Sequence, residues 1–250
     1  MLSSIVELRG KTALITGGAR RIGAATALAL AEAGVHLAIH YRASEADAAR
    51  LSDQVRAHGV RCALVRADLA QSGEVAALIG KAVDAAGPLD ILICNASIFP
   101  EATLREAAEE NVWENVRINA LAPMRLGLDF VAQGREGCIV NFLDTMVVDY
   151  DRKHVPYHLS KRMLYSITRM MALECAPKVR VNAVAPGLIL PPEGKDEDYL
   201  AGLAHSNPLQ RYGDARAVAE AVLFLLRAAF VTGQVIFVDG GRHLRGRVYD

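Results

Sequence analysis

The amino-acid sequence predicts an α/β fold in which a doubly wound, seven-stranded parallel sheet carries helices on both faces. Short apolar, β-branched runs alternate with longer Ala/Leu-rich segments, and the apolar runs show no in/out alternation. Continuous apolar strands are typical of a sheet buried on both faces, and strand–helix alternation implies parallel pairing with right-handed crossovers. The 250 residues are 52% hydrophobic and 22% charged. We therefore expect one domain over residues 1–250 with a large core.

Seven segments have the composition of buried strands, and six have helical spacing with few breakers. The strands are expected at 12–16, 35–40, 62–67, 91–94, 138–142, 179–185 and 234–238. The helices are expected at 22–33, 44–58, 74–86, 106–132, 157–175 and 214–228. The segment at about 190–213 differs, because it is rich in proline, glycine and charge. It follows a strand end, where open α/β sheets bind ligands, so it is either a substrate flap or a solvated excursion.

Composition and charge exclude several functional classes. Lys plus Arg and Asp plus Glu both total 28, so there is no net field to hold nucleic acid or an acidic membrane surface. No apolar run approaches the ~20 residues of a membrane span, and residues 1–11 lack the apolar core of a signal peptide. We therefore expect a cytoplasmic protein. The widely spaced Cys62, Cys94, Cys138 and Cys175 are predicted to be buried free thiols, and no metal site is expected.

A glycine-rich turn joins the first strand to the first helix, with the sequence Thr16-Gly17-Gly18-Ala19-Arg20-Arg21-Ile22-Gly23. Glycines allow backbone N–H groups and a helix N-terminus to approach a pyrophosphate. A tight turn without a ligand is the alternative, but a strand before and a helix after favour a Rossmann-type dinucleotide site. The residues expected to contact the dinucleotide here are Gly17, Arg20, Arg21, Ile22 and Gly23.

The end of the second strand favours NADPH over NADH. It reads His40-Tyr41-Arg42-Ala43-Ser44 and lacks the acidic residue that bonds the ribose 2′-hydroxyl in NAD sites. Arg42 and Ser44 beside Tyr41, with Arg21 from the glycine turn, are suited to a 2′-phosphate, although exposed arginines are often only solvated. Asp68 and Leu69 follow the third strand, where Asp68 either caps a helix or bonds the adenine.

Tyr157 and Lys161 are four residues apart in a predicted helix and therefore project from one face. An ammonium this close stabilises a phenolate, which lowers the pKa of Tyr157 toward working pH. Tyr157 then serves as a proton donor to a reduced oxygen or nitrogen.

Further motifs follow in order along the chain: Asn95-Ala96, Asn119, Asn182, Pro186-Gly187 and Asp239-Gly240-Gly241. Together with the glycine turn and Tyr157-x-x-x-Lys161, they resemble the short-chain dehydrogenase/reductase family over nearly the whole chain. The resemblance implies that Lys161 also bonds the nicotinamide ribose and that Asn119 holds a water in a proton relay. It further implies that Pro186-Gly187 lies alongside the nicotinamide and that the Asn95-Ala96-Ser97 segment contacts the cofactor. The family resemblance also implies a homotetramer.

One position departs from the family. The usual catalytic serine lies thirteen residues before the tyrosine, where this chain has Asp144, and no serine occurs between residues 134 and 159. A carboxylate repels a developing oxyanion but orients ring nitrogens and amino groups, and it helps deliver a proton to nitrogen. The Asp144, Tyr157 and Lys161 set resembles the branch of pteridine reductases and dihydromonapterin/dihydrofolate reductases.

Other features resemble the same branch. Ser97 and Phe99 occupy the places of a serine that contacts pterin or cofactor phosphate and of a phenylalanine that stacks on the pterin. Phe99 as a core residue is the alternative. Arg211 either faces the substrate or lies on the surface. The parasite-type enzymes have insertions that this chain lacks and a tyrosine where it has His154, so a compact bacterial-type reductase fits better and His154 is a pocket wall or a bystander.

The predicted reaction is hydride transfer from NADPH to a C=N bond of a pterin or dihydropterin, with dihydrofolate as a further candidate substrate. Tyr157 and Asp144 would handle the proton. Two alternatives stay open: a carbonyl reductase acting on a 3-oxoacyl thioester or a similar ketone, in which Asp144 is tolerated, and a catalytically silent NADPH-binding sensor.

Overall fold

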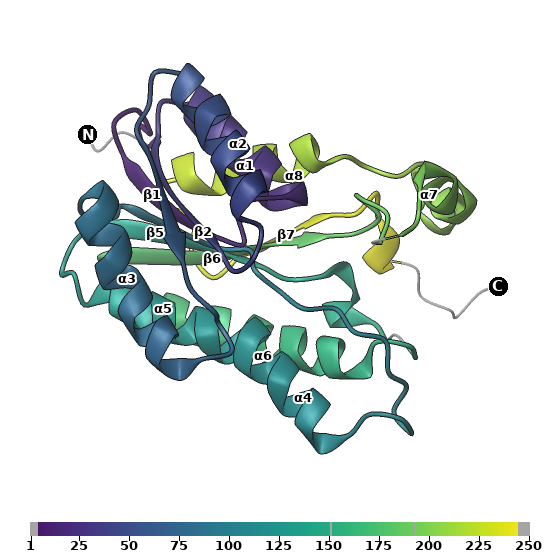
Figure 1. Ribbon diagram of the computed structural model, residues 1–250. Helices are drawn as coiled ribbons and strands as arrows, with labels where there is room; N and C mark the ends of the chain where they lie inside the picture. Colours follow the sequence, from purple (N-terminus) through teal and green to yellow (C-terminus); the bar gives the residue numbers. More distant parts are fainter. Residues whose placement is uncertain (1–4, 151, 193, 245–250) are drawn as a thin grey trace.

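The computed structural model describes residues 5–150, 152–192 and 194–244. Its seven strands form one parallel sheet in the order β3-β2-β1-β4-β5-β6-β7, which confirms the predicted fold class (Figure 1). The strands are β1 Thr12–Thr16, β2 His36–Tyr41, β3 Cys62–Arg66, β4 Ile91–Cys94, β5 Gly137–Phe142, β6 Val179–Pro186 and β7 Val235–Val238. The order reverses between β1 and β4, and ligands bind at such a switch point in open α/β sheets.

Helices cover both faces of the sheet. In Figure 1, α1 (Arg21–Glu32), α2 (Glu45–Ala57) and α8 (Ala215–Arg227) lie on one side. The other side carries four helices: α3 Ser72–Ala86, α4 Glu109–Val116, α5 Ala122–Val131 and α6 Val155–Glu174. This arrangement is the doubly wound architecture expected from strand–helix alternation.

The strands read as continuous apolar runs because each of their faces has a helical layer to pack against. In β1, Leu14 belongs to the core beneath α3, α5 and α6, whereas its neighbours Ala13 and Ile15 belong to the core beneath α1 and α8. All five residues of β1 are buried. The four cysteines are free and buried, as expected.

The segment 106–132, predicted as one helix, is interrupted in the structure. Helix α4 ends at Val116, a π-helical turn spans Arg117–Leu121, and α5 begins at Ala122. Pro123 explains the interruption, because proline has no N–H to donate to the carbonyl of Asn119, four residues earlier. The widened turn places Asn119 in the protein interior.

The segment 190–213 leaves the sheet after β6 and contains α7, Glu197–Leu203, which lies away from the two helical layers in Figure 1. Asp196 caps α7 by accepting a hydrogen bond from the Tyr199 backbone N–H. Residues 242–244 form a short 3-10 helix, and the rest of the C-terminal tail, 245–250, lies outside the described residues. Among the described residues, no helix is long and apolar enough to cross a membrane.

Candidate active site

The glycine turn and the end of β4 meet at the switch point of the sheet. Gly17 has a φ of 60°, and a Cβ there would lie 2.8 Å from Cα of Ala96. At Gly23 a Cβ would lie 2.5 Å from the carbonyl oxygen of Gly17. The Asn95 side chain donates to the carbonyls of Thr16 and Gly17 at 3.0 and 2.9 Å. The turn is therefore a close-packed cradle that only glycine permits, and Asn95 holds its shape.

The two arginines of the turn point to different neighbours. The Arg21 guanidinium donates to the carbonyl of Pro191 at 2.7 Å and lines the central cavity described below. Nε of Arg20 lies 3.9 Å from the Asp47 carboxylate in the first turn of α2, the helix that begins after Ser44. In this structure the Arg21 side chain is directed to the 190–213 segment, and its pairing with a 2′-phosphate at the end of β2 stays a prediction. Arg20 is the turn arginine beside α2.

At the end of β2, Tyr41 is half-buried, Arg42 is exposed, and Ser44 stands at the N-cap of α2 without a side-chain capping bond. Asp68 Oδ1 accepts a hydrogen bond from the Ala70 N–H at 3.0 Å, which closes a turn before α3. Helix α3 has Gln71 at its N-cap without a side-chain capping bond, so Asp68 does not cap it, and its contact with the adenine stays a prediction. The Leu69 side chain is buried in the core.

A cavity of about 160 Å³ gathers predicted site residues from five segments of the chain. Its walls are formed by Arg21, Ile22, Asn95, Ser97, Phe142, Leu143, Asp144, Tyr157, Lys161, Pro186, Gly187, Ile189 and Leu190. Four of these wall residues were not predicted from the sequence: Phe142, Leu143, Ile189 and Leu190. Their positions at or just after the ends of β5 and β6, at the ligand-binding edge of the sheet, are the signal that identifies them.

Tyr157, Asp144 and Lys161 form one connected group in this cavity. The Tyr157 hydroxyl donates to Asp144 Oδ2 at 3.1 Å, and Asp144 Oδ1 accepts from the Met146 N–H at 2.7 Å. Lys161 Nζ donates to the carbonyl of Phe142 at 2.7 Å and lies 5.6 Å from the centre of the Tyr157 ring. Only 6% of Tyr157 and 2% of Lys161 are exposed. The group therefore presents an O–H donor, a carboxylate and an ammonium to a small volume.

The electrostatics of this group differ from the sequence-based expectation. The pKa of Tyr157 is raised well above 10.0, first by burial and then by the charge and hydrogen bond of Asp144. The expectation that Lys161 lowers the pKa of Tyr157 is wrong for this structure. The Tyr157 hydroxyl is bonded to the Asp144 carboxylate, and the Lys161 ammonium is bonded to the Phe142 carbonyl. Burial lowers the pKa of Lys161 to about 8, against the opposing field of Asp144.

Phe99 is an aromatic wall beside Tyr157 and lies outside the core. It is 47% exposed, and its ring stands edge-on to Tyr157 with centroids 4.5 Å apart. The His154 ring is stacked on Phe99 at 3.9 Å and 12°. The core alternative for Phe99 is therefore wrong. His154, whose imidazole lies 3.8 Å from Glu101, is part of the same wall.

Asn119 connects the Phe99 loop to helix α6. Its amide oxygen accepts from the Ile98 N–H at 2.9 Å, and its amide nitrogen donates to the Ile98 carbonyl and to Ser160 Oγ, each at 3.0 Å. The side chain thus fixes the residue before Phe99. A water-holding role in a proton relay stays a prediction.

A buried network behind Asp144 was not found from sequence. Thr145 Oγ1 donates to Asp239, and Asp239 Oδ2 also accepts from the backbone N–H of His243, whose ring nitrogen lies 2.8 Å away. The Asp239-Gly240-Gly241 motif marks the position, but its partner Thr145 is 94 residues away in sequence. Arg211 is exposed and does not line the central cavity, and its carbonyl accepts from the Asn207 side chain.

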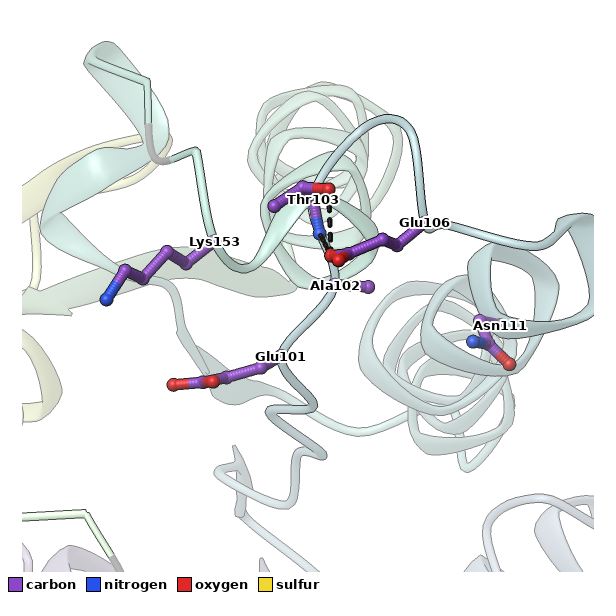
Figure 2. Close-up of a pocket in the computed structure, with 6 residues that line it drawn as sticks. All are labelled: Glu101, Ala102, Thr103, Glu106, Asn111 and Lys153. Carbon is purple, nitrogen blue, oxygen red and sulfur yellow. Dashed lines mark hydrogen bonds between the residues drawn. The ribbon is translucent and has the colours of Figure 1, made fainter.

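A second, more open hollow lies on the loop that follows Phe99 and is drawn in Figure 2. Its volume is about 470 Å³, and its lining is polar: Glu101, Ala102, Thr103, Glu106, Asn111 and Lys153. The Thr103 backbone and hydroxyl both donate to Glu106, as the dashed lines show. None of the predicted site residues lines this hollow. Within the described residues, no group of three His, Cys, Asp or Glu side chains is arranged to hold a metal ion.

The chain is similar to known proteins over almost its whole length. The family model described as enoyl-(acyl carrier protein) reductase matches residues 17–243. An uncharacterised oxidoreductase of Mycobacterium tuberculosis is 36% identical, with 96% of this chain and 95% of that protein covered. A 3-oxoacyl-(acyl-carrier-protein) reductase of Staphylococcus epidermidis is 30% identical, with 94% and 99% covered. The crystal structure of FolM alternative dihydrofolate reductase 1 from Brucella canis, complexed with NADP, superposes with a TM-score of 0.89 at 32% identity and covers 98% of this chain and 99% of that one.

Proposed function

The chain belongs to the short-chain dehydrogenase/reductase family, and on that premise we propose that it is an NADPH-dependent pteridine reductase. The single observation that carries the proposal is Asp144, whose carboxylate accepts the Tyr157 hydroxyl bond inside the central cavity. The similarity to the Brucella canis dihydrofolate reductase supports the same branch.

The residues at the switch point fit a dinucleotide phosphate. The Gly17 turn is backbone only, where a side chain would collide with Ala96, and it opens onto the N-terminus of α1, which favours anions. Arg42 and Ser44 at the end of β2 and the start of α2, together with Arg20 of the glycine turn, would hold the 2′-phosphate. Residues 40–44 contain no carboxylate, and Arg20 lies beside Asp47 in the first turn of α2. Pro186 and Gly187, which form part of the cavity wall, would lie alongside the nicotinamide.

Asp144 and Tyr157 divide the work at a substrate nitrogen. NADPH supplies the hydride, which adds to the carbon of a C=N bond. Tyr157 gives its hydroxyl proton to the nitrogen, so the bond becomes CH–NH, and the phenolate then regains a proton from solvent. The raised pKa of Tyr157 keeps this proton in place before reaction. Asp144, as a hydrogen-bond acceptor, orients a ring N–H or amino group.

The surroundings of the cavity suit a flat heterocycle. Phe99, held by His154 on one face and by Asn119 through Ile98, offers an exposed aromatic edge and face next to Tyr157. Aromatic rings bind planar ligands by stacking. Ser97 on the same loop lines the cavity and would contact the pterin or the cofactor phosphate.

A 3-oxoacyl thioester reductase is the second candidate, favoured by the similarity to the Staphylococcus epidermidis enzyme. In this candidate Tyr157 protonates a ketone oxygen and Asp144 is only tolerated. The sensor alternative is weaker, because Tyr157 and Lys161 are both held in the cavity as a reacting group requires.

A homotetramer is also proposed. The helices α4, α5 and α6 expose large apolar side chains that a partner subunit would cover. They include Trp113, Leu128, Met163 and Met170.

The deciding experiment measures NADPH oxidation by the purified protein with dihydrobiopterin, dihydrofolate and an acetoacetyl thioester in parallel. Turnover of either pteridine above the thioester supports the proposal. Turnover of the thioester alone assigns the protein to the carbonyl reductases, and NADPH binding without any turnover assigns it to the sensor alternative.

A further inference from the structure

His40 is a buried titratable residue to which the reaction assigns no part. It lies in β2 beneath the glycine turn and is 2% exposed. Its Nδ1 accepts a hydrogen bond from the Gly17 backbone N–H at 3.1 Å, and its Nε2 lies 3.0 Å from the carbonyl oxygen of Ala67, just past β3. The ring therefore spans from the glycine turn to the end of the neighbouring strand.

These two partners define the protonation state of the ring. A backbone N–H only donates, so Nδ1 must carry a lone pair, and a carbonyl only accepts, so Nε2 must carry the hydrogen. An imidazolium would present a second N–H to the Gly17 N–H and lose that bond. The contacts fit the neutral Nε2–H tautomer alone.

The charged groups that act on the ring are Asp68, which follows β3, and Glu74 in α3, and both favour the imidazolium. Burial opposes them and is the larger effect, so the pKa of His40 lies below its ordinary value of 6.5. The neutral ring that the hydrogen bonds require is therefore the form present at neutral pH.

The glycine turn is held from two sides, and His40 supplies one of them. On the β4 side, Asn95 donates to the Gly17 carbonyl at 2.9 Å. On the β2 side, the His40 ring accepts from the Gly17 N–H, and the His40 carbonyl accepts from the Gly18 N–H at 3.1 Å. Because Gly17 adopts the left-handed region with a φ of 60°, loss of the ring acceptor would leave the Gly17 N–H without its partner in a turn whose shape depends on these bonds.

We propose that His40 is a positioning residue for the dinucleotide, because its neutral ring fixes the glycine turn in the shape that receives the pyrophosphate, and protonation of the ring weakens cofactor binding. The inference rests on the proposed NADPH-dependent function. It assigns His40 no contact with cofactor or substrate.

Two amide substitutions separate the two bonds of the ring. In His40→Asn the amide oxygen occupies the place of Nδ1 and still accepts from Gly17, whereas in His40→Gln the amide nitrogen reaches the place of Nε2 and preserves only the bond to Ala67. We expect His40→Gln to raise the Kd for NADP⁺ and the KM for NADPH by about tenfold, because a buried N–H loses its acceptor, with kcat at saturating NADPH nearly unchanged. We expect His40→Asn to stay within about threefold of the unmodified protein.

His36 supplies a matched control on the same strand. Its Nδ1 accepts from the Arg61 N–H at 3.1 Å, which is the same kind of bond at the opposite end of β2. His36→Gln should leave the Kd for NADP⁺ unchanged. An equal loss of affinity in His36→Gln and His40→Gln would overturn the proposal, because the loss would then come from a general destabilisation of β2 and not from the bond between His40 and Gly17.

A pH series on the unmodified protein tests the same idea without relying on the folding of His40→Gln. Calorimetric titration with acid-stable NADP⁺ should show affinity falling below pH 6.5, the ordinary pKa of histidine, in excess of the fall seen for His40→Asn. The nucleotide phosphate titrates in the same way with both proteins, so the difference between their affinities at each pH reports the protonation of the His40 ring. Superimposable pH profiles, or equal affinities for all His40 variants, would overturn the role of His40 alone. Absence of NADP⁺ binding by the unmodified protein would instead overturn the proposed function.

Discussion

The Tyr157 hydroxyl donates to the Asp144 carboxylate at 3.1 Å inside the central cavity. This bond fixes the direction of proton flow: Tyr157 holds the proton and Asp144 offers a lone pair. A hydroxyl in place of Asp144 would donate a hydrogen bond to the oxyanion that develops when a ketone is reduced. The carboxylate of Asp144 instead repels this oxyanion, because both carry a negative charge. Under the proposed function, the pair therefore suits a substrate that carries both a basic nitrogen and an N–H group.

Tyr157→Phe removes the proton donor without changing the shape of the cavity. We expect kcat to fall by about 10²- to 10⁴-fold, the usual contribution of a general acid, while the Kd for NADPH changes little. Steady-state kinetics with dihydrobiopterin and a separate binding titration check the two parts. Full activity in this variant would remove Tyr157 from the proton path.

Asp144→Ser restores the hydroxyl that is usual in the family. We expect turnover of pterin to fall by about tenfold or more, because the acceptor for the substrate N–H is lost, while turnover of an acetoacetyl thioester stays equal or rises. Asp144→Asn is the matched control, since it keeps the size of the side chain and removes the charge. Faster pterin reduction by Asp144→Ser would contradict the assignment to the pteridine branch.

The strands were predictable because the cause of their pattern is local. Ala13, Leu14 and Ile15 of β1 each face one of two apolar layers, so the middle of the run 12–16 has to be apolar, and the structure places β1 at Thr12–Thr16. The glycine turn was predictable in part for the same reason, since Gly23 is required by its close approach to the Gly17 carbonyl six residues earlier, whereas the contact of Gly17 with Ala96 is distant in sequence.

Features that depend on distant parts of the chain were not predictable. The direction of the Arg21 side chain depends on Pro191, 170 residues away, and the support of the Asp144 turn depends on the bond from Thr145 to Asp239. The pKa of Tyr157 is raised by burial and by Asp144, so the helix spacing to Lys161 predicted the wrong direction. The π-helical turn at Asn119 had a local signal in Pro123 that the helical spacing outweighed.

The two arginines of the glycine turn should differ in their effect on cofactor choice. Arg20→Ala should lower the preference for NADPH over NADH by about tenfold, since it removes a charged partner of the 2′-phosphate beside Ser44. Arg21→Ala should leave this ratio unchanged, because its guanidinium bonds Pro191 at 2.7 Å. The ratio of kcat/KM for the two nucleotides, measured for both variants, decides between them. A larger change in this ratio for Arg21→Ala than for Arg20→Ala would show that Arg21 is the residue that pairs with the 2′-phosphate.

Lys161 should set the alkaline limit of activity. Its pKa is lowered to about 8, so the ammonium that the site uses is present below that pH and is lost as pH rises through it. The profile of kcat/KM reports groups of the free enzyme, and we therefore expect kcat/KM to fall above about pH 8. In Asp144→Asn the limit should move to lower pH, because the Asp144 charge raises the pKa values of both Lys161 and Tyr157.

The variant Lys161→Arg tests whether Lys161 sets this alkaline limit. A guanidinium keeps its charge across the whole range, so the decline above about pH 8 should disappear even if the overall rate is lower. The same decline in Lys161→Arg would assign the alkaline limit to another group. An alkaline limit that does not move to lower pH in Asp144→Asn would contradict the effect of the Asp144 charge on Lys161 that this prediction rests on.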